Sequence, residues 1–181
     1  MVKPWKALAR RLYRHSPFRA IEDVDFELPD GQVRTFALKK EGRVAVVVPL
    51  TSSGQVVLAR QFRPGPAQVL DELPGGGMEA GEAPQLAAAR ELLEETGYQA
   101  GSWLPLGTML DCAYSTIERH GFVALDCVEV AKQSLDPTED IQVVLKSVPE
   151  FMGQLQTGLC SDLEVGWAAL VKLGYLRPSW E

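Results

Sequence analysis

The first twenty residues combine basic side chains with apolar residues at helical spacing. Trp5, Leu8 and Leu12 lie three or four positions apart, and the segment carries six lysines and arginines but no acidic residue. Apolar residues that recur at intervals of three and four share one face of an α-helix. We therefore expect a basic amphipathic helix on the surface.

Most of the remaining chain groups its apolar residues in the manner of β-strands. β-Branched and aromatic residues dominate these runs, and turn residues such as Pro29–Gly31 and Thr51–Gly54 separate them. The run 44–50 is apolar throughout, which is typical of a central strand that is buried on both faces. The predicted strands cover residues 18–28, 33–38, 44–50, 55–62, 69–73, 104–110, 121–130 and 141–145.

One segment between these strands has strong helical character. Pro84 suits the first turn of a helix, the run 87–93 has high helix propensity, and Gly97 suits the C-terminal cap. These residues predict a helix over roughly 83–96.

Two further helices are predicted, near 149–156 and 161–173. Strands and helices mix without a regular βαβ rhythm, which favours an α+β fold, or a layered α/β/α arrangement, with a mixed β-sheet. We divide the chain into an N-terminal extension, residues 1–42, and a main domain, residues 43–181.

Composition narrows the possible partners and the compartment. A formal net charge of -6 and a pI near 5.0 argue against nucleic acid as a partner, so any phosphate must be held locally by a metal or a few arginines. The apolar run 44–48 is far too short to span a membrane. Three cysteines without a metal-ligand pair are typical of a reduced, cytoplasmic protein.

Three glutamates share one face of the helix predicted over 83–96. Glu91, Glu94 and Glu95 stand at i, i+3 and i+4, and like charges at this spacing cost about 0.2–0.5 kcal/mol per pair. The negative end of the helix dipole adds to the penalty. A hard divalent cation such as Mg²⁺ would relieve it, with a backbone carbonyl of the Gly75–Gly77 turn as a further oxygen ligand.

Gly76, Glu82 and the run 90–98 together resemble the Nudix box, the catalytic signature of the Nudix family. Five residues separate Gly76 from Glu82, seven separate Glu82 from Arg90, and the run reads Arg-Glu-Leu-Leu-Glu-Glu-Thr-Gly-Tyr. Tyr98 stands where an aliphatic residue is commoner. The resemblance implies a Nudix fold, an α/β/α sandwich, and Mg²⁺- or Mn²⁺-dependent hydrolysis of a nucleoside diphosphate linked to another moiety.

The resemblance also implies a role for each residue of the box. The metal ligands would be Gly75, through its carbonyl, Glu91, Glu94 and Glu95. Glu82 and Arg90 would support the loop and the helix. We count Glu94 and Arg90, together with a base outside the box, as the catalytic set.

Residues outside the box resemble the ADP-ribose pyrophosphatase subgroup. The flanks are Arg60–Arg63 and Glu72–Gly76, and Arg63 would grip the diphosphate, with Glu72 and Glu118 also at the substrate. The subgroup often uses a glutamate on a late loop as the base, which Glu139 matches best and for which Glu118 is the alternative.

One position departs from the subgroup pattern. A proline usually lies some fifteen residues beyond the box, whereas this chain has Ala113 there, followed by Tyr114. A tyrosine at slightly greater separation is typical of enzymes that act on dinucleoside polyphosphates, although Tyr114 also fits the role of a loop aromatic.

The N-terminal extension resembles the subgroup as well, in which such an extension builds a homodimer and shapes the base pocket. Trp5 would then either stack on a base or pack within its helix. We expect the chain to hydrolyse a nucleotide sugar, above all ADP-ribose, to a nucleoside monophosphate and a sugar phosphate. The alternatives are a dinucleoside polyphosphate or RNA-end pyrophosphohydrolase and a Nudix binding module without turnover.

Overall fold

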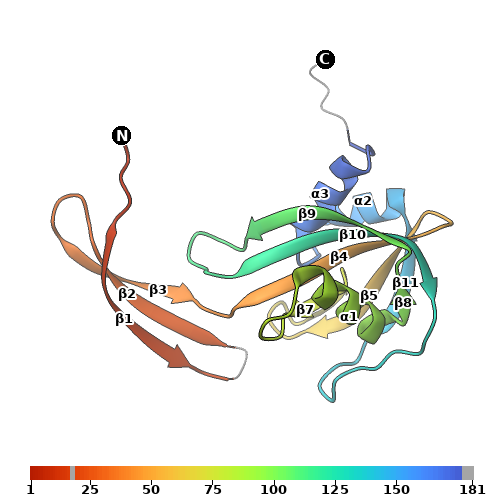
Figure 1. Ribbon diagram of the computed structural model, residues 1–181, viewed down its shortest axis with the longest axis horizontal. Helices are drawn as coiled ribbons and strands as arrows, with labels where there is room; N and C mark the ends of the chain where they lie inside the picture. The colour runs from red at the N-terminus through yellow and green to blue at the C-terminus, as the bar shows by residue number, and fades with distance from the viewer. Residues whose placement is uncertain (17–18, 177–181) are drawn as a thin grey trace. The chain divides into compact units, whose positions relative to one another are not determined.

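The computed structural model describes residues 1–16 and 19–176, which form two compact units (Figure 1). The N-terminal unit comprises Met1–Arg43 and Leu110–Glu118, and the core unit comprises Val44–Met109 and the chain from Arg119 onward. The chain therefore passes between the two units three times.

The N-terminal unit is a three-stranded antiparallel sheet in the order β1-β2-β3. Its strands are β1 (Lys6–Arg14), β2 (Ala20–Glu27) and β3 (Val33–Lys39). The 110–118 segment joins it, because Lys39 donates its N–H to the carbonyl of Tyr114 at 2.8 Å and Thr116 donates to the carbonyl of Lys39 at 2.9 Å.

The predicted N-terminal helix is wrong, because Lys6–Arg14 is strand β1. Cross-strand ion pairs hold it against β2, with Arg10 on Glu22 at 2.7 Å and both terminal nitrogens of Arg11 on Asp25 at 2.7 Å. The register shifts between Ala7 and Ala9. Such a bulge breaks the alternation by which a strand is recognised and leaves the apolar residues at helix-like spacing.

The core unit contains an eight-stranded mixed sheet, as the sequence predicted. Its main path runs β11-β5-β4-β10-β8, while β6 pairs with β5, β7 with β4 and β9 with β10. The strands are β4 (Arg43–Thr51), β5 (Gln55–Arg63), β6 (Gln68–Glu72), β7 (Gly75–Gly77), β8 (Tyr98–Gln99), β9 (Ser102–Leu110), β10 (Glu118–Glu129) and β11 (Gln142–Ser147).

Helices cover both faces of this sheet, which makes the core unit an α/β/α sandwich (Figure 1). Helix α1 (Pro84–Thr96) packs on one face, and α2 (Val148–Thr157) and α3 (Leu163–Lys172) pack on the other. Strand β4 sends Ala45 and Val47 toward α1 and Val46 and Val48 toward α2 and α3. It is apolar at every central position because both of its faces are covered, as predicted.

Helix α1 ends at Gly97, whose N–H donates to the carbonyl of Leu93. Gly97 has φ 76°, and a β-carbon there would lie 2.2 Å from the carbonyl oxygen of Ala131. Glycine is therefore required both by the left-handed cap and by the close approach of the following loop. No helix in the described part of the chain is long and apolar enough to cross a membrane.

Candidate active site

The glutamates of α1 differ in their burial although they share one helix face. Glu91 is 9% exposed and Glu95 is 4% exposed, whereas the Glu94 side chain is open to solvent. A carboxylate is rarely buried unless it is paired, because its transfer out of water is costly. Two of the three predicted metal ligands thus lie inside the protein.

Strand β7 passes directly over the two buried carboxylates. The N–H of Gly75 donates to Glu95 Oε2 at 3.0 Å. A β-carbon on Gly76 would lie 2.6 Å from the carboxyl carbon of Glu91, and one on Gly75 would lie 2.5 Å from the carbonyl oxygen of Ala45. Both positions require glycine because the strand runs between β4 and the glutamates with no room for a side chain.

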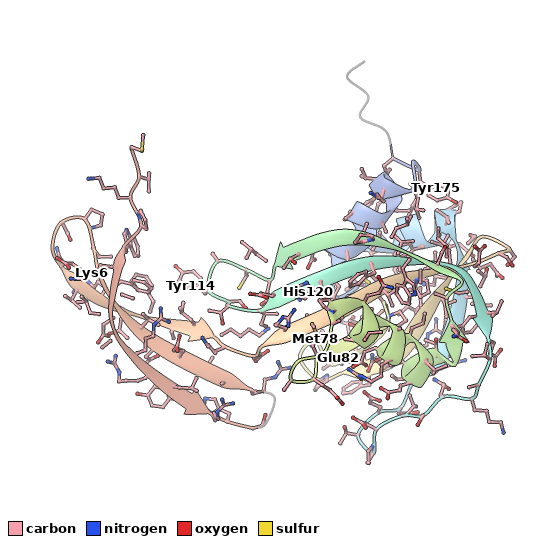
Figure 2. All side chains as sticks on the ribbon, viewed as in Figure 1. Lys6, Met78, Glu82, Tyr114, His120 and Tyr175 are labelled. Carbon is pink, nitrogen blue, oxygen red and sulfur yellow. The ribbon has the colours of Figure 1, made fainter. Side chains whose placement is uncertain are left out.

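Arg90 fastens the loop before α1 to the helix. Its Nε donates to Glu82 Oε1 at 3.1 Å and its Nη2 to the carbonyl of Gly77 at 2.9 Å. Its Nη1 donates to Glu91 at 2.7 Å and to Glu94 at 3.0 Å. Figure 2 labels Glu82 in this loop, where the Arg90 guanidinium and the N–H of Glu79 lower the pKa of its carboxyl.

The cluster carries more negative charge than its arginines offset. Burial is the main cause of the raised pKa of Glu91 and of Glu95, which reaches about 8 for Glu95, and the charge of Glu139 contributes to both shifts. Arg90 is shared with Glu82 and Glu94, so it cannot neutralise the whole group. A multiply charged cation beside the carboxylates would therefore stabilise their charged forms more than the arginines do.

The donor set fits a hard divalent cation. Glu91, Glu94, Glu95 and the nearby backbone carbonyls offer oxygen only, which is the ligand type of Mg²⁺ and Mn²⁺. Across residues 1–16 and 19–176, no three acidic, histidine or cysteine side chains converge into a ready-made cage. Arg90 Nη1 bridges Glu91 and Glu94.

Glu139 lies in the loop between β10 and β11, and its charge contributes to the raised pKa of Glu91 and of Glu95. Glu139 accepts the N–H of Asp136 at 2.9 Å on Oε2, and its own N–H donates to the Asp136 carbonyl at 2.9 Å. This reciprocal pair fixes the turn that presents the carboxylate.

Sequence reasoning missed the residue that braces this loop. The Gln133 side-chain amide donates to the carbonyl of Glu95 at 2.6 Å and to the carbonyl of Ile141 at 3.0 Å. Next to it, the N–H of Ser134 donates to the carbonyl of Glu94 at 2.8 Å. The Gln133 amide thus joins the two ends of the loop that contains Glu139 to the C-terminal end of α1. No sequence pattern predicts such a role for a loop glutamine.

Arg63 and Glu72 form an ion pair close to the cluster. Glu72 is 1% exposed and accepts a hydrogen bond from Arg63 Nε, and the Arg63 charge also lowers the pKa of Glu95. Arg63 and Glu72, both predicted at the substrate, therefore lie together.

Glu118 belongs to the other unit, where its carboxylate lies 3.5 Å from Arg43 Nε. The aromatic residues singled out in the sequence lie in that unit too. Tyr114 stacks on Phe36 with ring centroids 6.4 Å apart, and Trp5 contacts Phe36 at 5.4 Å. Within the N-terminal unit, Glu118 thus forms an ion pair, and Tyr114 and Trp5 pack against Phe36.

These features define a layered α+β protein in which a glycine strand lies against buried carboxylates of a helix. Residues 40–158 match the family model of the NUDIX domain. A solved structure described as that of an ADP compounds hydrolase aligns with a TM-score of 0.78 over 97% of this chain and 99% of that one, at 21% identity, which supports the fold.

Two curated relatives align at modest identity. The ADP-ribose pyrophosphatase of Bacillus subtilis (strain 168) is 28% identical over 150 residues, or 82% of this chain and 80% of that protein. The ADP-ribose pyrophosphatase of Mycobacterium tuberculosis is 36% identical over 77 residues, or 42% and 37% of the two chains. The chain belongs to the Nudix family, and the predicted fold and enzyme class, a Nudix pyrophosphatase, are confirmed.

Proposed function

We propose that this enzyme hydrolyses the diphosphate linkage of a nucleotide sugar, with ADP-ribose as the preferred substrate, to a nucleoside monophosphate and a sugar phosphate. The observation that carries the reaction type is the buried pair Glu91 and Glu95, packed under Gly75 and Gly76. The names of the two ADP-ribose pyrophosphatases support the substrate.

The helix and the glycine strand form the metal-holding part of the site. Glu91, Glu94 and Glu95 would bind Mg²⁺ or Mn²⁺ together with the carbonyl of Gly75. A divalent ion there neutralises diphosphate charge and makes water a stronger acid. Arg90 holds the loop and helix in place through Glu82 and Gly77.

Glu139 acts as the general base in this proposal. Its carboxylate takes a proton from water as the water oxygen attacks phosphorus, and the bond from that phosphorus to the bridging oxygen breaks. The attacked half leaves as one phosphate monoester and the bridging oxygen stays with the other. The Asp136 turn and the Gln133 brace hold Glu139 for this step.

Arg63 is the proposed clamp on the diphosphate. Glu72 holds it through Nε, and among the described residues no further partner is assigned to its two Nη groups, which suit bidentate contact with phosphate oxygens. Glu72 is buried and fixes the direction of the guanidinium.

A substrate panel tests the proposal. The protein is incubated with ADP-ribose, other nucleotide sugars, dinucleoside polyphosphates and nucleoside triphosphates, each with Mg²⁺ and with a chelator, and the products are identified. We expect metal-dependent release of AMP and ribose 5-phosphate from ADP-ribose as the fastest reaction. Turnover of triphosphates alone would overturn the sugar assignment.

Glu95→Gln tests the metal site separately. The variant keeps the shape of the side chain but loses the charge, and we expect kcat to fall by at least about 100-fold, because loss of even an outer-shell partner of a metal costs 10–100-fold. Activity equal to that of the parent would refute the assigned ligands.

We also propose that the N-terminal unit mediates a homodimer. Strand β1 is an edge strand in the described sheet, all its residues are exposed, and Leu8 and Leu12 are 47% and 45% exposed. An unpaired edge with exposed apolar residues is suited to pairing with another chain. Light scattering is expected to give twice the chain mass, and a monomer would remove this proposal.

A further inference from the structure

One buried polar side chain of strand β5 has no hydrogen-bond partner in the described part of the chain. This residue is Gln61, which is only 9% exposed. Other buried polar side chains of the core unit are paired, since Glu72 accepts from Arg63 and Glu95 accepts a backbone N–H. Burying an amide without a partner is costly, so the position of Gln61 needs a physical reason.

The Gln61 amide keeps a narrow opening to solvent. Within the described residues, neither Oε1 nor Nε2 of Gln61 is a fully covered atom that lacks a hydrogen bond. Because the amide has no partner there, both atoms must retain some exposed surface, although nine-tenths of the residue is buried. A donor and an acceptor that are open only at their tip are suited to contact a bound molecule.

The strand register places Gln61 on the same face of the sheet as Arg63. Side chains alternate along a strand, so both residues point to the side of Val57, which packs in the α1 cluster. The pairing of β5 with β6 and with β11 is continuous, so no bulge interrupts this alternation. The amide therefore opens on the face that carries the proposed diphosphate clamp.

The ion pair of this clamp spans the position of Gln61. In the ladder of β5 with β6, Ala59 pairs with Glu72 and Gln61 pairs with Leu70. Arg63 stands two residues beyond Gln61, about 7 Å along the strand, yet its Nε donates to the Glu72 carboxylate. The Arg63 side chain therefore extends back past the Gln61–Leu70 pair, which brings the guanidinium close to the amide.

On its other side, Gln61 adjoins the end of the loop that contains Glu139. The ladder of β5 with β11 ends where Arg60 pairs with Gln142, one residue before Gln61. From Gln142 the antiparallel chain leads back through Ile141 into this loop. Gln61 thus lies between the proposed clamp and the base of the loop that carries the proposed general base.

We propose that Gln61 binds the substrate, with Nε2 donating a hydrogen bond to a diphosphate oxygen beside the Arg63 guanidinium. The bound substrate would supply the partner that the folded chain does not provide. A neutral amide adds a directed donor to the clamp, whereas Arg63 supplies the charge. This inference rests on the proposed function, because it requires a diphosphate held by Arg63.

Gln61→Met tests the contact, because it keeps the length of the side chain and removes both polar atoms. We expect KM for ADP-ribose to rise at least about tenfold while kcat stays within about threefold, since a hydrogen bond to a charged group is lost from the bound substrate. The Tm of the variant without substrate should equal or exceed that of the parent, because the folded chain loses no hydrogen bond.

Gln99→Met is the matched control, since Gln99 is an exposed strand glutamine in β8. It should leave KM, kcat and Tm unchanged. If Gln61→Met does not fold, Gln61→Glu replaces it. That variant keeps the shape but places a carboxylate beside the phosphate, so its KM should rise at least as much.

Three outcomes would overturn the proposal for Gln61 in an active parent enzyme. They are a parental KM in the folded variant, a fall in kcat at unchanged KM, and a lower Tm of Gln61→Met together with its loss of activity, which would indicate a structural role. Failure of the proposed function is seen in the parent instead. If the parent does not hydrolyse ADP-ribose, the fastest compound of the substrate panel is used in the same comparison, and a parent without any turnover would overturn both proposals.

Discussion

Individual glycines shape the carboxylate cluster as much as the glutamates do. Gly76 leaves no space between its α-carbon and the carboxyl of Glu91, whereas the next residue, Gly77, has open space where a β-carbon would be. Neighbouring glycines in one short strand therefore have different reasons to be glycine. The difference makes a controlled experiment possible.

Gly76→Ala is expected to lower the free energy of unfolding by about 1–3 kcal/mol, because the added methyl group overpacks a filled site. It should also weaken Mg²⁺ binding, since Glu91 must move. Gly77→Ala is the control and should change stability by no more than about 0.5 kcal/mol. Urea unfolding and metal titration measure both quantities, and equal effects of the two substitutions would contradict the packing argument.

At the scale of single elements, a few side-chain hydrogen bonds hold the N-terminus of helix α2 and the base of the loop that contains Glu139. Helix α2 begins with a capping box, in which the Ser147 hydroxyl accepts from the N–H of Glu150 and the Glu150 carboxylate accepts from the N–H of Ser147. The Glu139 loop is held at its base by Gln133. Each element can be tested by one substitution.

Ser147→Ala is expected to cost about 1 kcal/mol of unfolding free energy through loss of the cap. Ser102→Ala, at an exposed position that starts β9, serves as the control and should be neutral. Chemical denaturation at neutral pH measures the difference. An equal loss in both variants would mean that the cap contributes nothing specific.

The same cap predicts a dependence on pH. The hydrogen bonds from Ser147 lower the pKa of Glu150 below its usual value. The folded state therefore favours the carboxylate, and this stabilisation is present at neutral pH and is lost as pH falls through the folded pKa. The stability difference between the parent and Ser147→Ala should narrow in acid, as measured by urea unfolding over a pH series. A difference that stays constant would argue against the carboxylate's part in the cap.

Gln133→Met is expected to lower kcat about tenfold or more while KM changes little, because the Glu139 loop loses both of its bonds to the brace. Mg²⁺ affinity should stay near that of the parent, since no predicted ligand is altered. Gln156→Met, on the exposed side of α2, is the control. A kcat equal to that of the parent in steady-state assays with ADP-ribose would rule out positioning by Gln133.

The sequence predicted a strand or helix correctly where its local pattern of apolar and terminal residues matches the burial seen in the structure. Strand β4 was predicted because its apolar run is buried on both faces, and α1 because Pro84 and Gly97 mark its ends. Strand β1 was missed because its bulge disrupts the alternation. The very short strands β7 and β8 carry too few residues for any period to emerge.

The sequence could predict only the part of the candidate site that depends on local spacing. Glu91, Glu94 and Glu95 stand out because their spacing on one helix is a local property. The pairing of Arg63 with Glu72 and the bracing by Gln133 depend on contacts between distant segments, which local spacing does not encode. Whether these residues act as proposed stays a prediction.

For the whole molecule, a bound cation should act as a stabiliser of the fold. The buried glutamates repel one another in the folded chain and are separated in the unfolded one, so a divalent ion binds the folded state preferentially. Mg²⁺ at about 100 times its dissociation constant should add about 2.7 kcal/mol, seen as a saturable rise in Tm by calorimetry. The double variant Glu91→Gln, Glu95→Gln should lose this rise. The same rise in both proteins would place the ion elsewhere.

The 110–118 segment has a consequence for how such a chain can be divided or assembled. Its backbone bonds with Lys39, and the stacking of Tyr114 on Phe36, tie it to the N-terminal strands, although it is joined covalently to β9 and β10. A deletion of residues 1–43 would strip these groups of their partners, so the remainder is not an intact smaller protein. The N-terminal strands and the 110–118 segment therefore form one structural unit. Transferring this unit to another Nudix protein would require both segments.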